Sequence, residues 1–166
     1  MKMELIQPFI SALDAVLADT LQSPVSISDL EMEEEGYRKK GFAAMITIKG
    51  EIEGRLILDM DSHAAAKIAS ALAGEEIEES DPAIRETVCE LANMVIGNAV
   101  TLLNDRGFTF KVFPPAVHTE EQLSAAGAET EAMVLSFETP HGFVHMNISM
   151  RYHRRRTRER TAVVVR

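Results

Sequence analysis

Apolar residues recur at helical spacing in three stretches of the chain. Over residues 3–21 they follow one another at intervals of three and four, which predicts an amphipathic helix. Because proline interrupts helical hydrogen bonding, this helix either begins near Pro8 or bends there. A second helix is predicted through AAAKIASALAG, with Asp61 or Ser62 as its N-cap and Gly74 as its end.

The third helical stretch is the longest. It is predicted to start at Pro82, because Ser80 or Asp81 can cap it and proline suits the first helical position. Its helical pattern continues to about Asn104, and the Arg106-Gly107 pair that follows predicts its end.

Strand-length runs of β-branched and large apolar residues surround these helices. FAAMITIKG and GRLILDM predict a hairpin centred on residues 50–54, and MVLSFET and FVHMNISMRY predict another around residues 140–142. FTFKVF predicts a strand closed by Pro114-Pro115, and VSISDLEM a short first strand. EEEGYRKKG and residues 118–131 are predicted to form a turn and a loop.

The order of these elements predicts the fold class. Helix, strands, two helices and strands follow one another, and tight turns join consecutive strands into antiparallel pairs. We therefore expect an α+β fold, a layer of antiparallel or mixed β-sheet with long helices packed on one face. Residues 1–152 are predicted to form one domain and residues 153–166 an Arg-rich, disordered C-terminal tail.

Composition agrees with an ordinary globular domain and excludes several classes of protein. The 166 residues are 46% hydrophobic and 26% charged, enough for one core. There is no run of about 18 apolar residues, and MKMELIQPF meets a charge and a proline too early for a signal peptide. We therefore expect a cytoplasmic protein without a membrane segment. The only cysteine, Cys89, excludes an internal disulfide.

Charge is divided unevenly along the chain. Residues 1–150 hold 10 basic and 25 acidic side chains, whereas residues 151–166 hold seven arginines against Glu159. Because an acidic body repels phosphates, we expect no nucleic-acid binding by the main domain. The tail is a solvated end, an anion-contacting segment, a docking peptide or a remnant of cloning, and short basic ends are most often solvated.

The helix from Pro82 to Asn104 carries the strongest functional pattern. Its apolar residues form one stripe, which predicts the side that faces the core: Ile84, Val88, Leu91, Val95, Ala99 and Leu102. On the opposite side, Glu86, Glu90, Asn93 and Gly97 lie within about 60° of one another. The two glutamates alone are typical of a solvated face. Asn and Gly are poor helix formers, and Gly costs about 1 kcal/mol relative to Ala, which favours a docking surface here.

A motif on this helix resembles a known family. Glu90-Leu91-Ala92-Asn93, then Gly97-Asn98-Ala99, a strand and Pro114-Pro115 resemble the signature of the CheC/CheX/FliY family of chemotaxis phosphatases. The resemblance covers about residues 20–150, and the single active helix is similar to the CheX branch. The family pattern has Asp or Ser where this chain has Glu86, and its later proline usually lies slightly further from the Asn than Pro115 does here.

This resemblance implies a phosphatase that hydrolyses the aspartyl phosphate of a CheY-type response regulator in chemotaxis. In the family the Asn orients the attacking water and the Glu pairs with a lysine of the regulator, roles that fall to Asn93 and Glu90. Glu86, Gly97 and Pro115 are then the expected binding residues. The regulator carries the Mg²⁺, so no cofactor or metal of its own is expected. A homodimer formed by strand pairing is also implied, with MVLSFET or FVHMNISMRY as the pairing edge.

Two other interpretations stay open. A scaffold of the same fold would bind a response regulator or the flagellar switch through the same face without turnover. A small-molecule or metal enzyme has little support, because the five histidines lack ligand spacing and there is no Gly-rich phosphate loop. Cys89 is predicted to pack between the core and the polar face rather than to act as a nucleophile.

Overall fold

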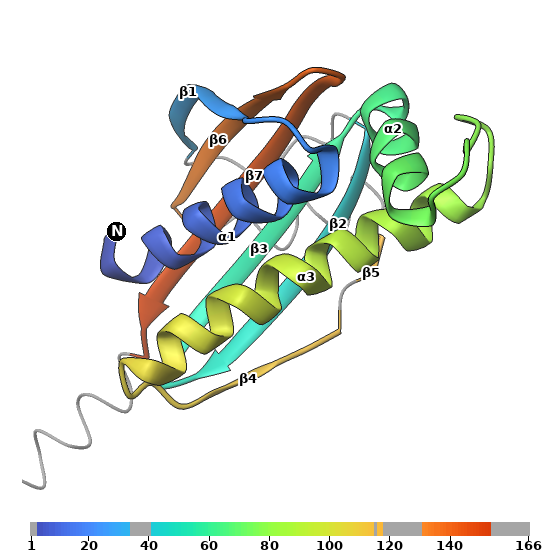
Figure 1. Cartoon of the computed structure of the whole chain (residues 1–166). Coiled ribbons are helices and arrows are strands. Elements are labelled where there is room, and N and C mark those ends of the chain that lie inside the picture. The colour runs from blue at the N-terminus through green and yellow to red at the C-terminus, as the bar shows by residue number, and fades with distance from the viewer. Residues whose placement is uncertain (1–2, 34–40, 115, 118–130, 154–166) are drawn as a thin grey trace, which may run out of the picture.

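A single antiparallel sheet carries the helices of the described chain on one face (Figure 1). The computed structural model describes residues 3–33, 41–114, 116–117 and 131–153. Its elements, in chain order, are α1 (Met3–Leu21), β1 (Ser26–Glu33), β2 (Phe42–Gly50), β3 (Ile52–Met60), α2 (Ser62–Ala73), α3 (Ala83–Asp105), β4 (Phe110–Val112), β5 (Ala116–Val117), β6 (Ala132–Thr139) and β7 (Gly142–Tyr152). The predicted α+β class with helices on one face is confirmed.

The strand order fixes which edges of the sheet are open. The strands lie in the order β1-β6-β7-β3-β2-β4, with β5 beside β2, and each neighbouring pair is antiparallel. The prediction that MVLSFET or FVHMNISMRY offers a free edge is therefore wrong. Those segments are β6 and β7, which lie inside the sheet because VSISDLEM forms most of the eight-residue β1, and β1 covers the outer edge of β6.

Helix α1 begins before its proline. Pro8 is buried within the helix, which starts at Met3. Because Pro8 has no N–H, the carbonyl of Glu4 loses its usual helical donor. The side chain of Arg106, at the end of α3, donates to that carbonyl at 2.7 Å. The proline is thus tolerated because a second helix supplies the missing hydrogen bond.

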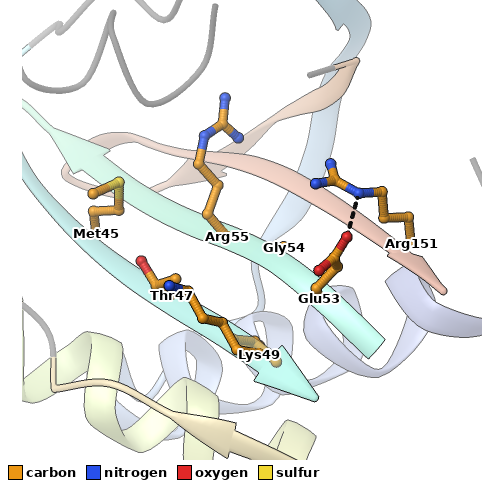
Figure 2. A pocket seen from close by; sticks show the side chains of 8 residues that line it. Met45, Thr47, Lys49, Glu53, Gly54, Arg55 and Arg151 are labelled. Carbon is orange, nitrogen blue, oxygen red and sulfur yellow. Dashed lines mark hydrogen bonds and ion pairs between the residues drawn. The ribbon is translucent and has the colours of Figure 1, made fainter. Parts of the chain in front are cut away.

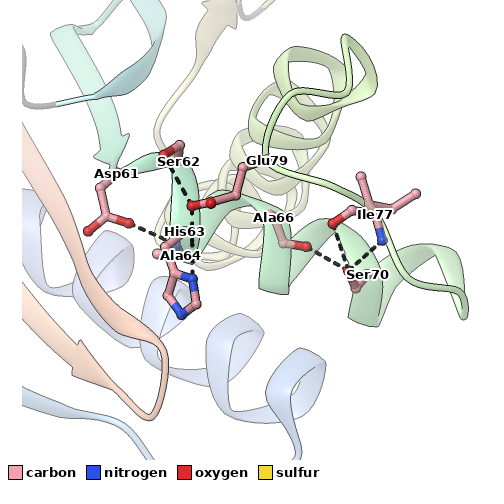
Figure 3. Close-up of polar contacts among 8 residues, drawn as sticks. All are labelled: Asp61, Ser62, His63, Ala64, Ala66, Ser70, Ile77 and Glu79. Atoms are coloured by element: carbon pink, nitrogen blue, oxygen red, sulfur yellow. Dashed lines mark hydrogen bonds and ion pairs between the residues drawn. The ribbon is translucent and has the colours of Figure 1, made fainter.

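Helix α2 is fixed at both ends by polar contacts (Figure 3). The Asp61 carboxylate accepts the Ala64 N–H at 2.8 Å, so Asp61 is the N-cap. Gly74 ends the helix in the left-handed conformation, with φ 72°. The Ser70 hydroxyl then accepts the Ile77 N–H at 2.9 Å, which ties the acidic segment after α2 back onto the helix.

Helix α3 begins at Ala83, one residue later than predicted, and the Asp81 carboxylate accepts the Ala83 N–H at 2.9 Å. Its predicted apolar stripe is buried except at its end. Leu102 is 42% exposed, whereas Leu103 is fully buried. Adjacent residues of α3 are buried together at Leu91–Ala92 and Val95–Ile96, but near the end of the helix Leu103 alone of the two leucines packs in the core. The prediction that Leu102 faces the core is therefore wrong.

Both predicted hairpins are present. Glu51 alone joins β2 to β3, and Pro140-His141 join β6 to β7. In β3, Gly54 lies so close to the Ser149 carbonyl of β7 that an added Cβ would collide with it. Pro115 lies outside the described residues, as do all but the end residues of the predicted turn at 33–41 and loop at 118–131 and all but the first residue of the predicted tail at 153–166.

Candidate functional site

The polar side of α3 points away from the sheet. Glu86, Glu90, Asn93 and Gly97 are all exposed, as the helical spacing predicts, and we call these four residues the α3 outer face. The opposite side of the helix is buried through Ile84, Val88, Leu91, Val95 and Ala99. Because the sheet holds α3 along its apolar stripe, the outer face is presented to solvent on a rigid element (Figure 1).

A shallow groove of about 430 Å³ runs along this face. It is lined by Arg85, Glu86, Cys89, Glu90 and Asn93. Sequence reasoning assigned Cys89 to packing and did not single out Arg85. Their spacing carried a signal, because residues 85, 89 and 93 follow one another at four-residue intervals and therefore form one row. Cys89 is half-buried, at the boundary between core and groove.

Three polar side chains of the groove, those of Glu86, Glu90 and Asn93, have no internal partner among the described residues. Among the described residues, no hydrogen bond or ion pair holds the carboxylates of Glu86 and Glu90 or the amide of Asn93. Two acceptor groups and one amide that can both donate and accept are therefore available to a partner.

A second hollow, of about 520 Å³, lies between α1 and α3. We call it the α1–α3 hollow, and it is lined by Ala15, Val16, Asp19, Asn93, Met94, Gly97 and Asn98. Asn93 lines both hollows, so it stands at their junction. An added Cβ at Gly97 would meet nothing within 4 Å, so internal packing does not require glycine there.

The face of the sheet opposite the helices, here called the far face, also has a hollow, of about 210 Å³ (Figure 2). Its charged groups are already held. Arg151 donates to Glu53 at 2.9 Å, and Arg55 donates to Asn147 at 2.9 Å. Lys49 lies 5.5 Å from the centre of a phenylalanine ring. The far face is therefore the less suitable binding surface.

No metal centre is evident in the part of the chain that the structure describes, where no three His, Cys, Asp or Glu side chains gather as ligands. Within the same ranges, no helix is both long enough and apolar enough to cross a membrane. Pro115, predicted as a binding residue, lies outside the described residues.

The family of the chain follows from its middle segment. Residues 42–138 match the family model described as chemotaxis phosphatase CheX. The chain belongs to the CheX family. The matched segment runs from β2 to β6 and contains the whole of α3 with its outer face.

Solved structures agree with this assignment. The CheX–CheY–BeF₃–Mg²⁺ complex from Borrelia burgdorferi is 31% identical, with a TM-score of 0.68, and the match covers 90% of this chain and 99% of that one. Chemotaxis protein CheX from Vibrio vulnificus is 22% identical with a TM-score of 0.73, covering 89% and 99%. A CheC-like protein from Shewanella sp. PV-4 is 21% identical with a TM-score of 0.76, covering 91% and 99%. None of the curated proteins matches the sequence.

Proposed function

We propose that this protein hydrolyses the aspartyl phosphate of a CheY-type response regulator in the cytoplasm. The observation that carries the proposal is the exposed Glu90–Asn93 pair on α3, whose side chains have no internal partner among the described residues. The pair lies in the segment that matches the CheX family model.

The proposed reaction needs little more than a well-placed water. The water oxygen attacks phosphorus in line as the bond from phosphorus to the aspartate oxygen breaks, giving inorganic phosphate and a free carboxylate. Such phosphoryl transfers depend on positioning and electrostatic stabilisation. The Asn93 carbonyl oxygen can accept a hydrogen bond from the attacking water and fix its direction. Asn93 thereby lowers the entropic cost of alignment, and no proton needs to reside on it.

Glu90 is proposed to anchor the regulator. Its carboxylate lies one turn before Asn93 on the same face, so a cation bound there sets the position of Asn93 over the phosphoryl group. The family resemblance points to a lysine of the regulator as that cation. Glu86 extends the negative charge by one further turn, and Gly97 lets the partner approach the helix closely.

The divalent ion is proposed to arrive with the regulator. The described residues hold no three-ligand cluster, and the solved Borrelia complex contains Mg²⁺ together with CheX, CheY and BeF₃. This protein then contributes only the amide and the carboxylate to a centre whose metal and phosphoryl group belong to its partner.

A homodimer is part of the proposal, with the edge corrected to β1. Among the described residues, β1 pairs with β6 on one side and has no partner on the other. It also carries three apolar side chains that are 46–51% exposed: Ile27, Leu30 and Met32. An open edge with apolar side chains favours pairing with a second strand. Sedimentation at micromolar concentration tests this: Leu30→Glu should shift a dimer to monomer, and a monomeric wild type would contradict it.

Phosphate release tests the catalytic proposal directly. Each phosphorylated CheY-type regulator of the source organism is followed with and without the protein. Acceleration by the wild type supports a phosphatase. Binding without acceleration of any regulator would instead identify a scaffold, for which the outer face is only a docking surface.

A further inference from the structure

We propose that the α1–α3 hollow is the second half of the regulator-docking surface and that Asp19 receives a basic side chain of the regulator there. This inference rests on the proposed function and extends it from α3 to α1. Asp19 would then determine which regulators bind, without touching the reacting atoms.

The first support is continuity with the proposed active site. Asn93 lines both the groove along α3 and the α1–α3 hollow, and Gly97 lies one turn further along the second of these. A partner that brings its phosphoryl group to Asn93 must rest on the surface around it. Toward α1, that surface is the hollow.

The second support is that Asp19 does not serve the fold. It lies in the last turn of α1, where the helix dipole disfavours a negative charge and where no basic side chain offsets it. Among the described residues no hydrogen bond or ion pair engages its carboxylate. An exposed acid that weakens its own helix is better explained by an external cation.

The third support is the shape and chemistry of the hollow around that acid. The small residues Ala15 and Gly97 keep it open, and Val16 and Met94 add apolar surface. Within the described part of the chain, Asp19 is the only charged residue that lines it. The amides of Asn93 and Asn98 also line the hollow and can accept hydrogen bonds. Apolar surface beside one carboxylate matches the long stem and charged head of a lysine or arginine, whereas an anionic group would be repelled.

The experiment compares the same substitution at two positions of α1. Asp19→Lys reverses the charge in the hollow, and Asp14→Lys makes the same change at an exposed position that does not line it. Binding of the CheY-type regulators, loaded with beryllofluoride and Mg²⁺, is titrated at low and high salt. Phosphate release gives KM and kcat, and thermal melts confirm folding. Asp19→Asn serves as the milder second variant.

We expect Asp19→Lys to weaken binding about tenfold at low salt, and less at high salt, because it places like charges together at the interface. The loss should fall on KM rather than kcat, Asp19→Asn should lose less, and Asp14→Lys should stay within about twofold. Equal losses at positions 14 and 19, or none at either, would overturn the inference.

The same measurements distinguish a failure of the proposed catalytic function from a failure of the inference about Asp19. If the wild type binds a regulator but releases no phosphate, catalysis is refuted, and the binding titrations alone decide the role of Asp19. If the wild type binds none of the regulators, both proposals fall.

Discussion

The α3 outer face and the far face of the sheet both carry polar residues, but the two sets differ in whether their side chains have partners among the described residues. On the far face, Arg55 donates to Asn147 although both side chains are buried, and Arg151 donates to Glu53. On the outer face, Glu90 and Asn93 are exposed and have no internal partner among the described residues.

This difference separates structure from function. A buried polar group must be hydrogen-bonded to avoid a large desolvation penalty, so the pairing of Arg55 with Asn147 is explained by the fold alone. Asn93 and Gly97 are poor helix formers in the middle of a helix. In the part of the chain that the structure describes, the Asn93 side chain has no hydrogen bond and nothing lies within 4 Å of a Cβ added at Gly97, so no contact compensates for either residue. Residues that lower the stability of a helix without a compensating contact are the ones to test for function.

Asn93→Ala should produce the largest effect on the outer face. We expect regulator dephosphorylation to fall about 100-fold or more, because the group that aligns the attacking water is lost. Binding of the beryllofluoride-loaded regulator should stay within about threefold, since the change removes a transition-state interaction. Thermal stability should be unchanged or higher, as Ala is the better helix former. Wild-type turnover in this variant would remove Asn93 from the mechanism.

Asn147→Ala should show the opposite pattern on the far face. Arg55 would lose the acceptor at 2.9 Å in a site where it is only 6% exposed. We expect the free energy of unfolding to fall by about 1–3 kcal/mol. Phosphate release per folded molecule should not change. Denaturant unfolding together with the activity assay checks both statements, and a selective loss of turnover would show that the two faces are coupled.

Glu90→Gln should weaken recognition by about tenfold at low salt and by less at high salt, because it removes one charge from an exposed ion pair. Glu78→Gln is the matched control, because Glu78 is also exposed, has no side-chain hydrogen bond or ion pair among the described residues, and lies outside the α3 groove. Titration across a salt series measures both variants. A salt-independent loss at Glu90 would argue against an ionic anchor.

Much of the fold could be predicted because local signals decide it. Asp61 and Gly74 bound α2 as the capping rules require, and the spacing along α3 located both its buried stripe and its exposed face. The family motif then pointed to Glu90 and Asn93. The helical spacing did not predict that Leu102 is exposed and Leu103 buried, because which of these adjacent leucines is covered depends on how the end of α3 packs against the rest of the fold.

What could not be predicted depends on contacts between distant segments. The pairing of β1 with β6 decides which strands lie at the edges of the sheet, and nothing in the residues of these two strands specifies that they pair with each other. Asp19 and Asn93 line the same α1–α3 hollow although they lie 74 positions apart in the chain. Residue spacing cannot predict such a site, because it relates only residues of the same helix or strand.

Gly97→Ala and Gly54→Ala form a matched pair of glycine substitutions. At Gly97 the added Cβ meets nothing within 4 Å, so the helix should gain up to about 1 kcal/mol. At Gly54 the Cβ would collide with the Ser149 carbonyl, so the sheet should be destabilised. Thermal melts compare the two. If Gly97→Ala is stabilising yet weakens regulator binding, close approach at this position is the reason for the glycine; a destabilised Gly97→Ala would contradict its assignment to docking.

Tyr152→Phe should have the smallest effect, because the contact it removes is internal but partly exposed. The Tyr152 hydroxyl donates to the Glu4 carboxylate, which joins the end of β7 to the start of α1. This hydrogen bond, with burial and the charge of Glu4 adding to it, raises the pKa of Tyr152 above its usual 10.0. The folded state therefore binds this proton more tightly than the unfolded state, so the contribution to stability is complete below pH 10 and is lost as the pH rises through the folded pKa. We expect the free energy of unfolding of the wild type to exceed that of Tyr152→Phe by about 0.5–1 kcal/mol at neutral pH.

Denaturant unfolding of both proteins at neutral and alkaline pH measures this difference in free energy, which should shrink toward zero at alkaline pH. Phosphate release at neutral pH should be equal in the two proteins, and a difference in stability that did not change with pH would show that the ring rather than the hydroxyl carries the effect.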